Sequence, residues 1–142
     1  MKVRGFDGRD RNWRLDKYKV YGDDSKRRSS YHIRARGILC SLLPHDRILE
    51  EVKLPGSNKL SRGLLIADFY VPSRMLMVEV HGRQHYEYVS HFHGNRFEFL
   101  RAKARDRDKV KWCELNEINI VELKYDESDQ QWEDRIRSVL QL

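Results

Sequence analysis

The sequence of 142 residues predicts an α/β (α+β) fold, in which helices flank a mixed sheet in the order α-β-β-β-α-β-α. Three observations lead to this fold class. The length suits one domain, since domains commonly span roughly 100–200 residues. The spacing of apolar residues switches between the helical and the extended period along the chain. Segments of both kinds follow one another, which favours a sheet covered by helices.

The first helix is predicted over residues 31–43, after an N-terminal segment without a sustained period. Its apolar residues recur at the helical spacing i, i+3, i+4, i+7 and i+8: Ala35, Ile38, Leu39, Leu42 and Leu43. Ser29 or Ser30 can cap its start, and Pro44 ends it. Residues 1–30 are therefore expected to form an arm, and residues 31–142 the globular domain.

Three strand-like segments follow the first helix. Residues 47–54 alternate loosely, whereas residues 64–71 and 75–81 are almost continuously apolar and stop at Pro72 and Gly82. Such continuous runs are typical of strands buried on both faces.

The remaining segments complete the predicted order. Residues 89–116 follow the helical period, with Val110 and Cys113 on the apolar side. Residues 118–123 are predicted to form the last strand, and residues 131–142 an amphipathic helix.

The positive charge is concentrated at the N-terminus. The net charge is +6, and residues 1–30 contribute +5 of it, with ten Lys and Arg against five Asp. Basic residues interleaved with Trp13 and Tyr18 favour contact with the phosphates and bases of a nucleic acid, and Arg27 and Arg28 are the expected contacts of this arm. DNA is the expected partner, with RNA left open. The alternative is a solvated, partly disordered tail.

Composition argues against other classes of protein. No apolar run approaches the roughly 20 residues that cross a bilayer, and the chain begins with no apolar signal segment. Cys40 and Cys113 do not make a disulfide framework and suit a reducing compartment. We therefore expect a cytoplasmic protein without a membrane partner. The oligomeric state stays open, a homodimer included.

Two carboxylates interrupt the buried strands. Asp68 and Glu79 each stand in an otherwise apolar run, where an unpaired charge is unfavourable. If the two strands form a hairpin, both side chains reach the same face at adjacent positions. A divalent cation would relieve their repulsion, and carboxylate oxygens suit Mg²⁺ or Mn²⁺. The alternative is that arginines such as Arg74 or Arg105 pair with them.

The residues around these carboxylates resemble a nuclease superfamily. The chain is similar to the PD-(D/E)XK superfamily, and within it to the very-short-patch-repair (Vsr) endonucleases and related domains of phage and mobile-element proteins, through two segments: Asp68-Phe-Tyr-Val-Pro and Met77-Val-Glu79-Val-His81-Gly82-Arg-Gln84-His85. The resemblance covers about residues 31–125. It implies a restriction-endonuclease-like core and a metal-dependent DNA endonuclease that hydrolyses phosphodiester bonds, with nicking or structure-specific cleavage left open.

The resemblance also implies roles for single residues. Asp68 and Glu79 would bind the metal together with the main-chain carbonyl of Val80. His81 stands where most of the superfamily has a lysine and the Vsr branch a histidine. Gln84 and His85 stand where related sequences place polar active-site groups.

The chain departs from the superfamily pattern in two ways. Its motif has no lysine, so His81 or Gln84 must take over that role. Its first helix has no acid, so the third metal ligand would be Glu51 or Glu50 on the first strand, or His32.

The neighbouring residues would support hydrolysis. His81 would take the proton of the attacking water. Arg105-Asp106 matches an Arg-Asp pair of related domains, so Asp106 would hold His81 or His85 in place; the alternative is a salt bridge from Asp106 to a nearby arginine. Arg83 and Arg105 would hold the DNA backbone.

Other functions compete with this reading. His81, His85, His91 and His93 fall within thirteen residues and suggest a zinc site or an unrelated histidine-metal nuclease around His91 and His93, although structural zinc sites usually include cysteines at short spacing. A non-catalytic nucleic-acid-binding protein on the same scaffold is the main alternative, and a structural protein that binds through the sheet edge is a third.

Overall fold

The computed structural model describes residues 1–18, 29–59, 63–83, 86 and 96–142. Its centre is a four-stranded sheet in the order β3-β4-β5-β6. The strands are β3 (Leu49–Lys53), β4 (Ile66–Val71), β5 (Leu76–His81) and β6 (Asn119–Lys124). β3, β4 and β5 pair antiparallel, whereas β6 runs parallel to β5. The predicted mixed sheet and α/β (α+β) class are therefore confirmed.

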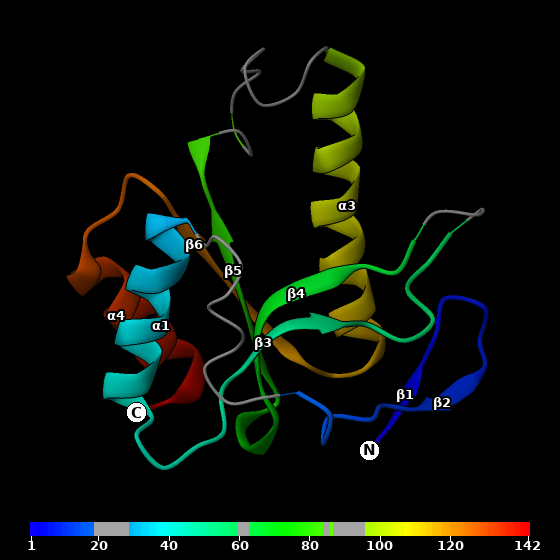
Figure 1. Ribbon diagram of the computed structural model, residues 1–142, viewed down its shortest axis with the longest axis horizontal. Helices are drawn as coiled ribbons and strands as arrows, with labels where there is room; N and C mark the ends of the chain where they lie inside the picture. The colour runs from blue at the N-terminus through cyan, green and yellow to red at the C-terminus, as the bar shows by residue number, and fades with distance from the viewer. Residues whose placement is uncertain (19–28, 60–62, 84–85, 87–95) are drawn as a thin grey trace.

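Helices cover both faces of this sheet (Figure 1). They are α1 (Ser30–Leu42), α3 (Arg96–Leu115) and α4 (Asp129–Leu140). α1 and α4 lie on one face, over a cluster that includes Phe69 and Val78. α3 lies on the other face, where Trp112 and Cys113 join Met77 in a second cluster. In the described part of the chain, none of the helices is both long and apolar enough to cross a membrane.

The predicted elements agree with the observed ones to within a few residues wherever the structure describes them. Ser29 caps α1, as expected, since its side chain accepts the backbone N–H of His32. α4 begins at Asp129, two residues before its predicted start, because Ser128 and Gln131 form a capping box there. The predicted start of the α3 helix, residues 89–95, lies outside the described residues.

The expectation of a separate N-terminal arm is wrong for residues 1–18. Strands β1 (Lys2–Arg4) and β2 (Asp10–Asn12) form a small antiparallel sheet, and Val3 and Trp13 are buried in the cluster beneath α3. The Trp13 ring lies 4.4 Å from that of Tyr70, and its indole N–H donates to the Lys53 carbonyl at 3.1 Å. This segment therefore belongs to the core. Residues 19–28, with Arg27 and Arg28, lie outside the described residues.

Candidate functional site

Asp68 and Glu79 meet where the β4–β5 ladder ends. The register of the two strands pairs Phe69 with Val78, so the next step places Asp68 opposite Glu79. At this step, backbone N–H groups bond to side-chain carboxylates instead of to backbone carbonyls. The Asp68 N–H donates to Glu79 Oε2 at 2.7 Å, and the Val80 N–H donates to Asp68 Oδ2 at 2.8 Å. The predicted hairpin and the adjacency of the two carboxylates are confirmed. Because backbone amides hold both carboxylates, their positions are fixed before any ligand arrives.

A lysine from α3 reaches the same pair. Lys109 Nζ lies 2.5 Å from Glu79 Oε1, and both side chains are largely buried. Burial and then the nearby Asp68 carboxylate raise the pKa of Glu79 to about 8, while Lys109 opposes the rise. Burial alone would lower the pKa of Lys109, but the Glu79 and Asp68 carboxylates together raise it. Lys109 therefore stays cationic next to the two carboxylates.

Lys109 was missed at the sequence level, although one signal pointed to it. It lies one turn from Asp106 and Cys113 on the inward side of the helix. The alternative in which an arginine neutralises the carboxylates is wrong. Arg74 contacts Asp46 at 3.3 Å instead, and Arg105 pairs with neither carboxylate in the described part of the chain.

His81 continues the site along β5, two residues after Glu79 and on the same face. Its ring is 3% exposed and has acidic groups on both sides. Nδ1 lies 3.4 Å from Glu122 Oε2, and Nε2 lies 3.9 Å from Asp106 Oδ1. The Tyr86 hydroxyl lies 3.5 Å from Nδ1. The two carboxylates fix the orientation of the imidazole ring, whose nitrogens can accept or donate a proton.

A pocket opens beside this histidine. Its volume is about 260 Å³, and it is lined by His81, Tyr86, Lys103, Asp106, Arg107, Val110 and Glu122. The sequence placed Asp106 on the inward side of its helix, next to His81 or His85, and the structure brings it to His81. Two further cations, Lys103 and Arg107, face the same space, which therefore combines a proton acceptor with groups that attract an anion.

The three candidates for a third metal ligand separate in space. Glu50 is buried beside α1, where Oε1 lies 2.5 Å from His32 Nε2 and 3.0 Å from Arg36 Nη2. Burial would raise the pKa of Glu50, but hydrogen bonds from His32 and Arg36 lower it below its ordinary value. Glu50 and His32 thus contact each other beside α1, whereas Lys109 of α3 reaches Glu79, and Glu50 Oε2 is buried without a hydrogen-bond partner among the described residues. The structure therefore does not bring Glu50 and His32 together with Asp68 and Glu79.

Glu51 remains as the third candidate. It lies between two register pairs of β3 and β4, at the position opposite Asp68. Its φ of 52° is unusual for a residue with a side chain, and the residue is exposed. Glu51, Asp68 and Glu79 therefore follow one another across three neighbouring strands.

The donor set suits a hard divalent cation in its chemistry. Asp68 and Glu79 contribute carboxylate oxygens, which Mg²⁺ and Mn²⁺ prefer. Among the described residues, Asp68 Oδ1 takes part in none of the hydrogen bonds that fix the pair. In the same part of the chain, no group of three or more His, Cys, Asp or Glu residues is arranged to hold a metal ion. A cation would thus require Glu51 to turn inward or Lys109 to release Glu79.

Several predicted site residues lie elsewhere or outside the described residues. Gln84 and His85 fall outside them, as do His91 and His93 of the zinc hypothesis. Arg83 is exposed at the end of β5, within two residues of His81.

Comparison with known proteins identifies viral relatives. Uncharacterized protein 307L of Invertebrate iridescent virus 6 is 37% identical over 73 residues, which cover 51% of the chain and 37% of the relative. Uncharacterized protein 094L of Frog virus 3 is 40% identical over 63 residues, or 44% of the chain and 41% of the relative. Uncharacterized protein 033L of Invertebrate iridescent virus 3 is 31% identical over 68 residues, or 48% and 35%. The chain thus spans well under half the length of these relatives. No family model and no solved structure matches it.

Proposed function

We propose that the chain is a metal-dependent DNA endonuclease with a restriction-endonuclease-like core of the Vsr-like PD-(D/E)XK type. The observation that carries the proposal is the Asp68–Glu79 pair at the end of the β4–β5 ladder, with His81 two residues further along β5. Buried carboxylates cost stability unless they are paired. Such a pair beside a histidine and a lysine offers oxygen ligands for a metal, a proton acceptor and a cation, which are groups that can support phosphodiester hydrolysis. The resemblance is to domains of phage and mobile-element proteins, whereas the relatives found belong to iridescent viruses and Frog virus 3; a virus-encoded protein that acts inside the cell is part of the proposal.

The residues would divide the chemistry among them. Asp68 and Glu79 would hold Mg²⁺ or Mn²⁺, with Glu51 or the Val80 carbonyl as further ligands, and the bound cation would act as a Lewis acid toward the phosphate. His81 accepts the proton of the attacking water at a ring nitrogen. Asp106 and Glu122 stabilise the resulting imidazolium, because both lie within 4 Å of the ring.

Lys109 supplies the ammonium that the strand motif lacks. The superfamily residue at position 81 is usually a lysine, and here the lysine comes from α3 to the same carboxylate. An ammonium at this place stabilises negative charge that develops on the phosphate in the transition state.

Metal-dependent cleavage tests the proposal. The full chain is incubated with branched, mismatched, nicked and linear DNAs, and with RNA, in the presence of Mg²⁺, Mn²⁺ or EDTA. We expect cleavage of at least one DNA that EDTA abolishes. The variant Glu79→Gln should be inactive, whereas Glu114→Gln, which changes an exposed glutamate of α3, should cut at the wild-type rate. Cleavage by Glu79→Gln at the wild-type rate would refute the site.

One observation favours a second function, that of a non-catalytic nucleic-acid-binding protein. Lys109 already pairs with Glu79, and an internal ion pair makes a metal unnecessary for holding the carboxylates together. This alternative predicts binding that weakens with salt, without cleavage in any of the metals tested.

A further inference from the structure

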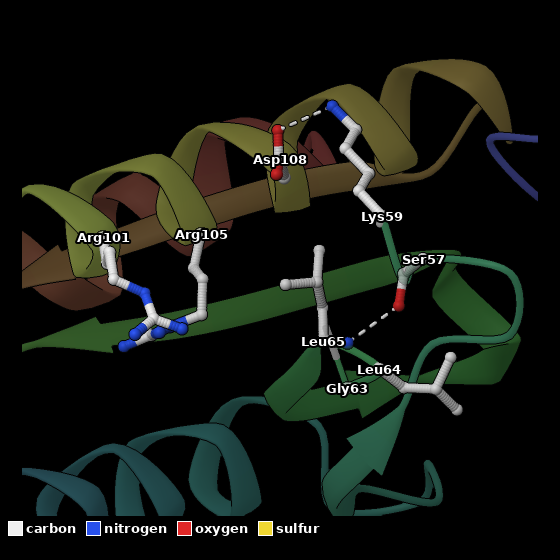
Figure 2. A pocket seen from close by; sticks show the side chains of 8 residues that line it. All are labelled: Ser57, Lys59, Gly63, Leu64, Leu65, Arg101, Arg105 and Asp108. Carbon is white, nitrogen blue, oxygen red and sulfur yellow. Dashed lines mark hydrogen bonds and ion pairs between the residues drawn. The ribbon is translucent and has the colours of Figure 1, made fainter. Parts of the chain in front are cut away.

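A second pocket lies between α3 and the chain that leads into β4. Its volume is about 490 Å³, and Figure 2 shows it from close by. The residues that line it are Ser57, Lys59, Gly63, Leu64, Leu65, Arg101, Arg105 and Asp108. None of the carboxylates or histidines of the proposed active site is among them.

Two arginines dominate the charge of this pocket. Arg101 and Arg105 are four residues apart on α3, so they share one face of the helix, and in Figure 2 both side chains extend from α3 into the pocket. Asp108 is the only carboxylate among the described residues of the lining, and it is bound to Lys59 at 3.0 Å. Arg101 forms a long ion pair with Glu98, at 3.4 Å. Arg105 forms no ion pair with any described residue. Like charges four residues apart on one helix face repel each other, and an anion between them would relieve the repulsion.

The other described lining residues provide few polar side-chain groups that could form hydrogen bonds with a base. Ser57 is occupied, because its hydroxyl donates to the Leu54 carbonyl at 2.6 Å and accepts the Leu65 N–H at 2.8 Å. The other lining residues, Gly63, Leu64 and Leu65, carry no polar side chain. Among the described lining residues, the polar groups left for a ligand are therefore the two guanidinium groups, whose planar N–H donors match the oxygens of a phosphate.

The pocket lies close to the proposed active site along α3. Arg105 lies four residues before Lys109, and Arg101 lies eight residues before it. At 1.5 Å per residue, these spacings are about 6 Å and about 12 Å along the helix axis. Successive phosphates of one strand of duplex DNA rise by about 3.4 Å. These distances correspond to roughly two to four nucleotides.

We propose that Arg101 and Arg105 bind a backbone phosphate of the DNA, two to four nucleotides from the phosphodiester held at Asp68 and Glu79. The proposal rests on the proposed function, since it takes the cut site as its reference point. The contact is independent of base sequence and fixes the position of the strand relative to the catalytic residues.

The test measures DNA binding in EDTA, where cleavage cannot interfere. Fluorescence anisotropy at a series of salt concentrations compares wild type with Arg101→Gln, Arg105→Gln and the control Lys111→Gln, which removes an exposed charge from the same helix outside the pocket. Circular dichroism confirms that each variant is folded. We expect each arginine variant to bind roughly tenfold more weakly and to lose about 0.9 from the log–log salt slope. The control should change neither quantity by a comparable amount.

Neutral linkages then locate the phosphate. In a set of oligonucleotides, each carries a single methylphosphonate, and its position moves by one linkage from one oligonucleotide to the next. Each oligonucleotide is made with and without a 5′-terminal phosphate. One internal linkage should weaken binding to wild type and have no further effect on Arg105→Gln. The proposal is overturned if the arginine variants and Lys111→Gln lose affinity equally, or if only the terminal phosphate matters. An arginine-dependent linkage in a protein that cuts no DNA would instead refute the nuclease assignment, and with it the stated distance from a cut site.

Discussion

Glu79→Gln should remove a large pH dependence from the stability of this domain. Burial and Asp68 raise the pKa of Glu79 from 4.5 to about 8. Between these two values the folded protein keeps a proton that the unfolded chain has released. The free energy of unfolding of wild type therefore falls as the pH rises from about 4.5 to about 8. Glutamine has nearly the same shape and does not titrate, so the variant lacks this contribution.

The size of the effect follows from the interval between the two pKa values. One pH unit corresponds to about 1.4 kcal/mol, and an interval of about 3.5 units gives on the order of 5 kcal/mol. This is a large part of the roughly 5–15 kcal/mol that stabilises a typical domain. Wild type should therefore lose several kcal/mol more than Glu79→Gln across this range.

Urea unfolding followed by the fluorescence of the buried tryptophans measures the difference at each pH, in EDTA. Glu114→Gln serves as the control and should follow wild type. Parallel curves for wild type and Glu79→Gln would refute the reasoning, because they would mean that Lys109 keeps Glu79 ionised as readily as water does. Millimolar Mg²⁺ adds a second test: a cation bound to the pair favours the ionised carboxylate, so it should flatten the wild-type curve and leave that of Glu79→Gln unchanged.

Three further outcomes follow from the structure. Asp68→Asn should abolish cleavage yet retain DNA binding in a gel-shift assay, and cleavage at the wild-type rate would exclude Asp68 from the site. His81→Ala should lower the cleavage rate on the order of 10²–10⁴-fold, whereas His81→Lys should keep part of the activity; a loss below about threefold in the alanine variant would assign the proton transfer elsewhere. Trp13→Ala should lower the free energy of unfolding by about 3–5 kcal/mol, and an unchanged urea midpoint would contradict the burial of the N-terminal segment.

The sheet and the carboxylate pair could be predicted because local signals specify them. Apolar runs that end at Pro72 and Gly82 define β4 and β5, and the short connection through Pro72 makes the two strands a hairpin. Once the hairpin is known, the alternation of side chains places Asp68 and Glu79 on one face.

Other features depend on contacts between distant residues, which local patterns do not encode. β1 and β2 have three residues each, too few for a readable period, and Trp13 is buried only because it meets Tyr70 and Trp112. Glu50 and Glu51 are neighbours in a strand, so the period of two separates them by face. It does not say which face holds His32 and Arg36, the residues that Glu50 contacts instead of Asp68 and Glu79.

Helix α3 carries residues of both proposed contacts with DNA, so the two contacts are linked through one rigid element. Its inward face carries Asp106 to His81 and Lys109 to Glu79, and its preceding turns carry Arg101 and Arg105 to the second pocket. Trp112 anchors the far end of the helix, since its ring is fully buried and its indole N–H donates to the Pro55 carbonyl at 2.9 Å. A rigid helix transmits any rotation along its length, so the phosphate at the arginines and the groups around Glu79 keep a constant separation. If a DNA strand binds in the pocket as proposed, this fixed separation would bring one particular phosphodiester to the carboxylates, so that a contact without base specificity would select the bond that is cut.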